Sequence, residues 1–193
     1  MSYTDVEYKF KKLGKDVQIG KNVYFRYPEL IEIGDHVIID DFCYFTTSLT
    51  IGSFIHIGPH CSVIGGKNGK LVMGDFSGLS AACRIICCSD DYLSDGLTNP
   101  TIPPKYHAKL KLSTVEIGKH AVIGTGAVIH PAVRIGEGAA VGSMTLVTKD
   151  LDAWGVYLGI PARKVKERNR DVILRFEVEL LKEQENAKRN SEC

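Results

Sequence analysis

Bulky apolar residues recur at every sixth position along most of this chain. Fifteen positions keep the period, in three blocks: Ile33, Ile39, Phe45, Ile51, Ile57 and Val63, then Met73, Leu79 and Ile85, then Ile117, Ile123, Ile129, Ile135, Val141 and Val147. We call these residues the anchors. A strand repeats its side-chain direction every two residues and a helix about every 3.6, so neither alone produces a period of six. The pattern instead predicts short strands that are joined by tight turns and wound into a coil.

The positions around the anchors repeat as well. The residue after an anchor is frequently glycine, as at Gly34, Gly52, Gly58, Gly74, Gly118, Gly124, Gly136 and Gly142. We expect these glycines to relieve turns that need unusual backbone angles. Four places after an anchor the residue is small or apolar, and we expect it to point inward. Stacked coils would bury both sets in continuous columns, so the predicted fold class is an all-β parallel β-helix of hexapeptide repeats.

Two interruptions break the period. The first, residues 65–70, is predicted to be a short turn between coils. In the second, from about residue 90 to residue 113, the period disappears and Pro100, Pro103 and Pro104 occur. An excursion loop of this length on a regular scaffold is typical of a functional segment.

The chain ends differently from its repeats. From about Arg170 to Asn190, apolar residues alternate with charged ones, which predicts an amphipathic C-terminal α-helix. We expect this helix to cap the open end of the coil and protect its last edge. The predicted organisation is an N-terminal segment at 1–16, a β-helix domain at 17–164 with the excursion at about 90–113, and a helix and tail at 165–193.

Composition narrows the class of function. The chain has 193 residues, of which 44% are hydrophobic and 24% charged, with a formal net charge of +1. This balance argues against nucleic acid or a membrane surface as a partner. No apolar run approaches the roughly 18 residues that span a bilayer, and Met1 to Lys15 lacks the apolar centre of a signal peptide, so a cytoplasmic location is expected.

The six cysteines do not form a recognisable metal or disulfide pattern. Cys43, Cys61 and Cys83 fall on the small inward position of the repeat, where a free cysteine acts as a small buried apolar residue. Cys87 and Cys88 are adjacent, and Cys193 lies in the polar tail. Because neither a CxxC spacing nor a matching histidine pair is present, no zinc site and no required metal are predicted.

The repeats resemble a known superfamily. The stretch VEIGKHAVIGTGAVIHPAVRIGEGAAVGSMTLVTKDLDAWGVYLGIPARKVKER is similar to the end of hexapeptide-repeat acyltransferases, including maltose and galactoside O-acetyltransferases. The segments DFSGLSAACRI, SDDY and LTNP resemble a group that modifies O-antigen and capsule. The resemblance covers roughly residues 17–166. It implies a left-handed β-helix, a homotrimer with active sites between subunits, acetyl-CoA as co-substrate, and acetyl transfer to a sugar hydroxyl.

The same resemblance implies where the co-substrate binds. Backbone groups around Gly124, Gly142 and Ser143 would contact the pantetheine arm, while the cations Lys149, Arg163 and Lys164 would approach the phosphates, as the chemistry of these groups allows. The alternative interpretation is that the glycines are only turns and the basic residues are a solvated rim.

Acyl transfer to an alcohol needs a base that takes the hydroxyl proton. The superfamily's histidine at the start of the excursion is absent, and Asp90 stands at about its place, with Asp91 beside it. Asp91 would raise the pKa of Asp90 by like-charge repulsion, or Asp90 would orient a histidine from elsewhere. His56 is the preferred base, and His107, inside the excursion, is the second candidate. His60 is expected to point to solvent, as are His36, His120 and His130.

Three other functions remain open at this stage. An N-acetyltransferase of a nucleotide-linked amino sugar would tolerate the missing histidine, because an amine is a better nucleophile. A γ-class carbonic anhydrase would bind zinc through three histidines, with His56 and His60 close in sequence. A structural or sugar-binding β-helix would need no base.

Overall fold

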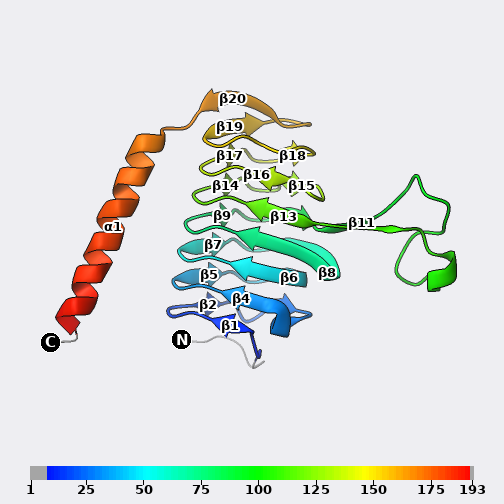
Figure 1. Cartoon of the computed structure of the whole chain (residues 1–193), viewed down its shortest axis with the longest axis horizontal. Coiled ribbons are helices and arrows are strands. Elements are labelled where there is room, and N and C mark those ends of the chain that lie inside the picture. The colour runs from blue at the N-terminus through cyan, green and yellow to red at the C-terminus, as the bar shows by residue number, and fades with distance from the viewer. Residues whose placement is uncertain (1–7, 192–193) are drawn as a thin grey trace.

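The computed structural model describes residues 8–191 as a β-solenoid with an arm on one side and a helix on another (Figure 1). The first seven residues of the expected N-terminal segment and Cys193 lie outside the described residues. Successive coils pair in parallel along the solenoid. The predicted β-helix with an excursion and a C-terminal helix is confirmed.

Two large sheets form the solenoid. The eight-stranded sheet has the order β2 (Gln18–Ile19), β5 (Val37–Ile39), β7 (Ile55–Ile57), β9 (Gly78–Leu79), β14 (Val122–Ile123), β17 (Ala140–Val141), β19 (Gly155–Leu158) and β20 (Arg163–Glu167). The ten-stranded sheet contains β1 (Lys12–Leu13), β3 (Tyr24–Phe25), β4 (Ile31–Ile33), β6 (Tyr44–Ile51), β8 (Ser62–Met73), β10 (Arg84–Ile86), β13 (Thr114–Ile117), β15 (Val128–Ile129), β16 (Arg134–Ile135) and β18 (Leu146–Val147). Strand pairing thus begins at β1, before the expected boundary at residue 17, and β20 crosses the boundary expected at 164.

The ten-stranded sheet supplies two of the three sides of the coil, because β6 and β8 continue around a corner. The first part of β6 pairs with β3, through Tyr24 with Tyr44, while its last part pairs with β4, through Ile33 with Ile51. The third side is the eight-stranded sheet. Two short 3-10 helices, Pro28–Leu30 and Pro104–Tyr106, complete the connections outside the strands and α1 (Arg170–Ser191).

The core consists of the columns that the period predicts. Every one of the fifteen anchors is buried, and so are the small residues four places later, including Cys43, Cys61 and Cys83. Burying each aliphatic anchor contributes about 1.5–3 kcal/mol. Each of the three thiols also donates a hydrogen bond to a backbone carbonyl, at Gly58, Ser80 and Gly124 respectively. The inward register predicted from the sequence is therefore confirmed.

The glycines after the anchors have a different role from the one expected. None of them adopts a positive φ; that conformation occurs two residues later, at His36, Phe54 and corresponding corners. A Cβ atom on Gly34 would lie 2.6 Å from the carbonyl oxygen of Gly52 in the next coil. These positions are glycine because adjacent turns stack too closely for a side chain, and the prediction of unusual backbone angles was wrong there.

The interruption at residues 65–70 is not a turn between coils. These residues lie within β8, which pairs with β6 on both sides of residues 67–69, with register shifts after Thr46 and after Thr47. Gly66 has a φ of 61°, a conformation that glycine adopts without strain. The extra residues therefore form a β-bulge on the solenoid wall.

The C-terminal helix does not cap the end of the coil. That end is covered by β20, which pairs antiparallel with β19, whereas α1 runs along the side of the solenoid (Figure 1). Glu177 of α1 contacts both Lys119 and His120, and its carboxylate lies 2.8 Å from Nε2 of His120. His120, expected to be solvated, is therefore buried beneath the helix.

Candidate active site

The excursion forms a narrow arm that projects from the solenoid (Figure 1). Its base is a two-stranded antiparallel ribbon of β11 (Cys88–Asp90) and β12 (Leu110–Leu112). Further out, the backbone N–H of Ala108 donates to the carbonyl of Leu97 over 2.8 Å, and that of Leu97 donates to the carbonyl of Tyr106 over 2.8 Å. Hydrogen bonds thus connect the two sides of the arm at its base and again further out.

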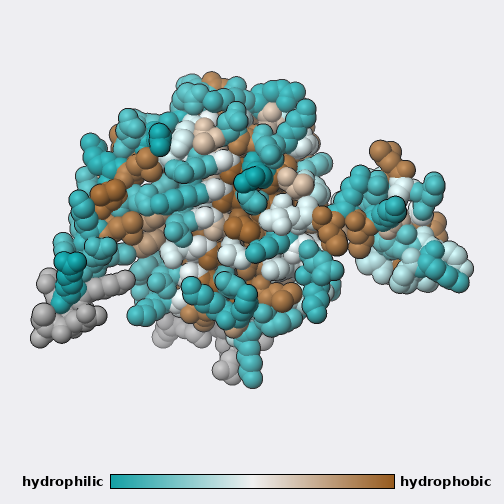
Figure 2. All heavy atoms as spheres, viewed as in Figure 1, coloured by the Kyte–Doolittle hydropathy of each residue, from teal (hydrophilic) through white to brown (hydrophobic). Residues whose placement is uncertain are grey.

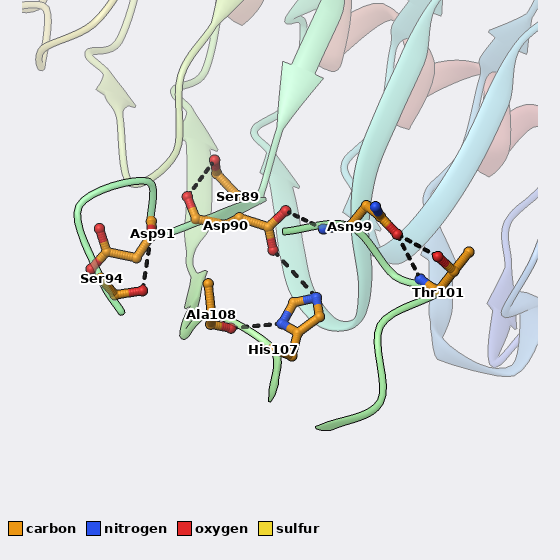
Figure 3. Close-up of polar contacts among 8 residues, drawn as sticks. All are labelled: Ser89, Asp90, Asp91, Ser94, Asn99, Thr101, His107 and Ala108. Atoms are coloured by element: carbon orange, nitrogen blue, oxygen red, sulfur yellow. Dashed lines mark hydrogen bonds and ion pairs between the residues drawn. The ribbon is translucent and has the colours of Figure 1, made fainter. Parts of the chain in front are cut away.

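The arm brings Asp90 and His107 together (Figure 3). Nε2 of His107 lies 3.6 Å from Oδ1 of Asp90, and the two side chains are only 14% and 19% exposed. The other carboxylate oxygen accepts a 3.2 Å hydrogen bond from the backbone N–H of Asn99. Nδ1 of His107 lies 2.6 Å from the carbonyl oxygen of Ala108. A shielded carboxylate and a fixed imidazole are groups that can accept and hold a proton.

Asp91 turns away from this pair. Its Oδ1 lies 3.0 Å from Nζ of Lys111 on the neighbouring strand. The hydrogen bond from Lys111, followed by that from the backbone of Leu93, lowers the pKa of Asp91. Asp91 is consequently paired with a cation instead of facing Asp90 directly. The charge of Asp90 is felt by Cys88, whose thiol pKa is raised by burial and then by this carboxylate.

His56 lies elsewhere, on the outer side of β7 in the eight-stranded sheet. Its Nε2 is 2.8 Å from Oδ2 of Asp40, and the two side chains are 60% and 39% exposed. The imidazole lines a groove on the solenoid with Ser80 and Val122. Within one chain the histidine that meets Asp90 is therefore His107, while His56 has Asp40 as its partner. His60 is exposed at a corner, as expected, and stacks on Phe42.

The residues predicted to bind the co-substrate follow the last coils. A Cβ atom on Gly124 would lie 2.6 Å from the backbone nitrogen of Ser143, and one on Gly142 would meet the side chain of Leu158. Leu158 pairs in turn with Arg163 across β19 and β20. Gly124, Gly142, Ser143 and Arg163 thus lie in succession along one edge.

The three predicted cations are not equivalent. Nζ of Lys164 lies 2.6 Å from Oε1 of Glu167, and this hydrogen bond raises the pKa of Lys164. Arg163 is exposed and donates from Nη1 to the carbonyl of Ala162. Lys149 is exposed after β18, which belongs to the other large sheet. Of the two cations on β20, Arg163 therefore has the charge that is available to a phosphate without displacing a carboxylate.

Two groups of the site escaped the sequence analysis, because both belong to the backbone. The N–H of Asn99 and the carbonyl of Ala108 orient Asp90 and His107. The identity of a side chain does not reveal which backbone N–H or carbonyl will lie beside a given site, so neither group could be predicted from the sequence. Among residues 8–191, no group of three or more His, Cys, Asp or Glu is arranged to hold a metal ion. No described helix is long and apolar enough to cross a membrane.

A solenoid of hexapeptide repeats with a projecting arm is the architecture of a left-handed β-helix acyltransferase. Residues 114–149 match the family model of the bacterial transferase hexapeptide with six repeats. The chain is 35% identical over 180 residues to dTDP-4-amino-4,6-dideoxy-D-glucose acyltransferase of Escherichia coli, covering 90% of this chain and 92% of that one. The chain belongs to the hexapeptide-repeat acyltransferase superfamily, and it is an acyl-CoA-dependent acyltransferase.

Solved structures show the same relationship. The N-acyltransferase AntD from Bacillus cereus, in complex with dTDP and 3-hydroxybutyryl-CoA, is 39% identical with a TM-score of 0.83, over 91% of this chain and 92% of that one. A variant of AntD in complex with dTDP-4-amino-4,6-dideoxyglucose and coenzyme A is 40% identical with a TM-score of 0.82, over 90% and 92% of the two chains. A maltose O-acetyltransferase from Clostridium difficile 630 is 20% identical with a TM-score of 0.52, over 83% and 71%, and shares the fold.

These comparisons overturn the expected chemistry. The sequence predicted O-acetylation of a sugar hydroxyl, with amino-sugar N-acetylation as the alternative. The relatives that match nine-tenths of the chain at 35–40% identity act on an amino sugar or are N-acyltransferases. The absence of the superfamily's histidine from the start of the arm agrees with this correction, because an amine needs less help from a base than a hydroxyl does.

Proposed function

We propose that this protein transfers an acyl group from acyl-CoA to the 4-amino group of dTDP-4-amino-4,6-dideoxyglucose. The observation that carries the proposal is the match along nine-tenths of the chain to the Escherichia coli and Bacillus cereus enzymes. The shielded carboxylate of Asp90 supports it. A neutral amine attacks a thioester through its own lone pair, so a base is needed chiefly to remove a proton from nitrogen, and a carboxylate serves for that.

In this proposal Asp90 accepts the proton from the sugar nitrogen. Gly124, Gly142 and Ser143 present backbone groups to the pantetheine arm, and Arg163 meets the phosphates, with Lys149 and Lys164 contributing charge nearby. Extended amides pair naturally with backbone at the edge of a strand, and phosphate needs cations. The reaction balances as amine plus thioester giving amide plus free thiol.

We also propose that three copies assemble, with the arm of one reaching toward the next. The arm exposes large apolar side chains, namely Tyr92, Leu93, Leu97, Tyr106, Leu110 and Leu112. Figure 2 shows hydrophobic residues where the arm leaves the solenoid. An exposed apolar group of this size is typical of a surface that another protein covers. Analytical ultracentrifugation tests the assembly, and a monomer at micromolar concentration would contradict it.

The test of function uses two matched acceptors. We expect the purified protein to release coenzyme A from acetyl-CoA or 3-hydroxybutyryl-CoA in the presence of dTDP-4-amino-4,6-dideoxyglucose, with an N-acylated product seen by mass spectrometry. dTDP-6-deoxyglucose, which carries a hydroxyl at C4 instead of the amine, is the control and should give no product. Turnover on dTDP-6-deoxyglucose at a similar rate, or none on the amino sugar with either donor, would refute the proposal.

A further inference from the structure

Asp90 and His107 form a histidine–carboxylate pair that is shielded from solvent and does not serve to dock another element. The pairs of His36 with Asp16 and of His56 with Asp40 have at least one largely exposed partner. The pair of His120 with Glu177 is shielded, but it fastens α1 to the solenoid. In the arm, a segment with little core of its own, both partners are nevertheless largely buried. Such shielding strengthens electrostatic coupling between two groups.

The backbone of the arm decides which nitrogen of His107 carries the proton. A carbonyl oxygen only accepts hydrogen bonds, so the 2.6 Å contact with Ala108 requires a hydrogen on Nδ1. Ala108 is itself buried and is fixed by its hydrogen bond to Leu97. In the neutral imidazole Nε2 then holds a lone pair, and this nitrogen is the one that faces Asp90.

The carboxylate is fixed from its other side. The backbone of Asn99 occupies Oδ2 of Asp90 and leaves Oδ1 directed at Nε2 of His107 (Figure 3). Two lone pairs that face each other leave room for one proton between them. Asp90 is therefore placed beside a group that can share a proton it has just accepted.

We propose that His107 is a positioning residue for Asp90, locked by Ala108 in the tautomer whose Nε2 shares the proton that Asp90 removes from the acceptor nitrogen. This inference rests on the proposed N-acyl transfer. As the C–N bond forms and the C–S bond breaks, the proton leaves nitrogen for Asp90, is shared with Nε2, and ends on the thiolate of coenzyme A. No oxidant, reductant or further reactant is needed.

Substitutions at His107 separate this role from a structural one. We expect His107→Gln, which keeps a donor but cannot take up a proton, to lower kcat about 10–100-fold while KM for both substrates stays within about twofold. His107→Ala should lose more, and added imidazole should restore part of its kcat. His36→Gln is the matched control, because it removes a histidine–aspartate pair from a solenoid corner. Unchanged kcat in His107→Gln, or a change in KM alone, would overturn the proposal.

Nitrogen NMR of histidine-labelled protein decides the geometry without any substrate. We expect the neutral form of His107 to carry its hydrogen on Nδ1, and we expect Asp90→Asn to perturb the Nε2 signal most. A hydrogen on Nε2 in the neutral form would overturn the inference. A wild-type protein that shows the expected tautomer but acylates no amino sugar would instead overturn the proposed function.

Discussion

The solenoid and the arm place the same two residue types in opposite surroundings. On the solenoid, His56 and Asp40 lie 2.8 Å apart with side chains 60% and 39% exposed, whereas in the arm His107 and Asp90 lie 3.6 Å apart with side chains 14% and 19% exposed. Water screens the electrostatic interaction between His56 and Asp40 and makes it weak. Shielding therefore distinguishes the two pairs more clearly than distance does, and it favours the pair in the arm as the candidate site.

The largest expected effect breaks the solenoid alone. Ile123 is only 1% exposed, so Ile123→Asp places an unpaired charge in the core. We expect this to lower the free energy of unfolding by more than about 4 kcal/mol and to abolish cooperative thermal unfolding. The control is Val122→Asp on the adjacent outward position, which should melt close to wild type. Wild-type melting of Ile123→Asp would contradict the register of the core.

The next effect concerns the arm. Asp90→Asn keeps the shape of the side chain but cannot accept the proton, so we expect kcat to fall about 100-fold or more. Calorimetric titration with acetyl-CoA should give unchanged affinity. His56→Gln is the rival variant, since the sequence analysis favoured His56 as base. If His56→Gln lost as much activity while Asp90→Asn kept it, the base would belong to the solenoid.

A smaller effect concerns the docking of α1 against the side of the solenoid. Burial acts to raise the pKa of Glu177, but hydrogen bonds from Lys119 and His120 outweigh it and hold the pKa below its ordinary value of 4.5. A carboxylate of this kind stabilises the docked helix above that pH, and the contribution is lost as the pH falls through the lowered value. We expect Glu177→Gln to speed hydrogen exchange in α1 roughly tenfold at pH 7, about 1.4 kcal/mol.

The same experiment has a matched control. Glu179 is exposed on α1 and lies 3.9 Å from Arg175, so Glu179→Gln should leave exchange almost unchanged. The difference between Glu177→Gln and wild type should disappear once the pH has fallen below the lowered pKa of Glu177, where the wild-type carboxylate is protonated as well. A difference that persists there would show that charge is not what docks the helix.

The smallest expected effect concerns the basic residues of β20, which we propose to lie near the phosphates of acyl-CoA. We expect Arg163→Ala to weaken acetyl-CoA binding about three- to fivefold, and Lys164→Ala to weaken it less, because Lys164 already pairs with Glu167. Both losses should shrink in high salt. Lys182→Ala on α1 controls for net charge. Equal losses at all three positions would indicate a general charge effect instead of a phosphate site.

The period of six predicted the solenoid because it is a local rule repeated in every coil, so that anchor pairs with anchor one coil away, as Ile33 does with Ile51 and Ile39 with Ile57. The role of the glycines after the anchors was predicted wrongly, because the close stacking of coils that requires them involves residues far apart in the sequence. His120 was misplaced because its cover, Glu177, lies 57 residues further along. Asp90 and His107 were both candidates, but their pairing was not predicted, because a single crossing of the arm, with no repeat behind it, brings them together.

One feature of the arm makes it a separable module. It leaves and rejoins the coil at neighbouring points, where the N–H of Ser113 donates to the carbonyl of Cys87 over 2.9 Å and the Ser113 hydroxyl donates to the same oxygen over 3.1 Å. Loop closure there costs the solenoid little, whatever the length between. The arm can thus vary in length and content at this junction while the scaffold stays the same.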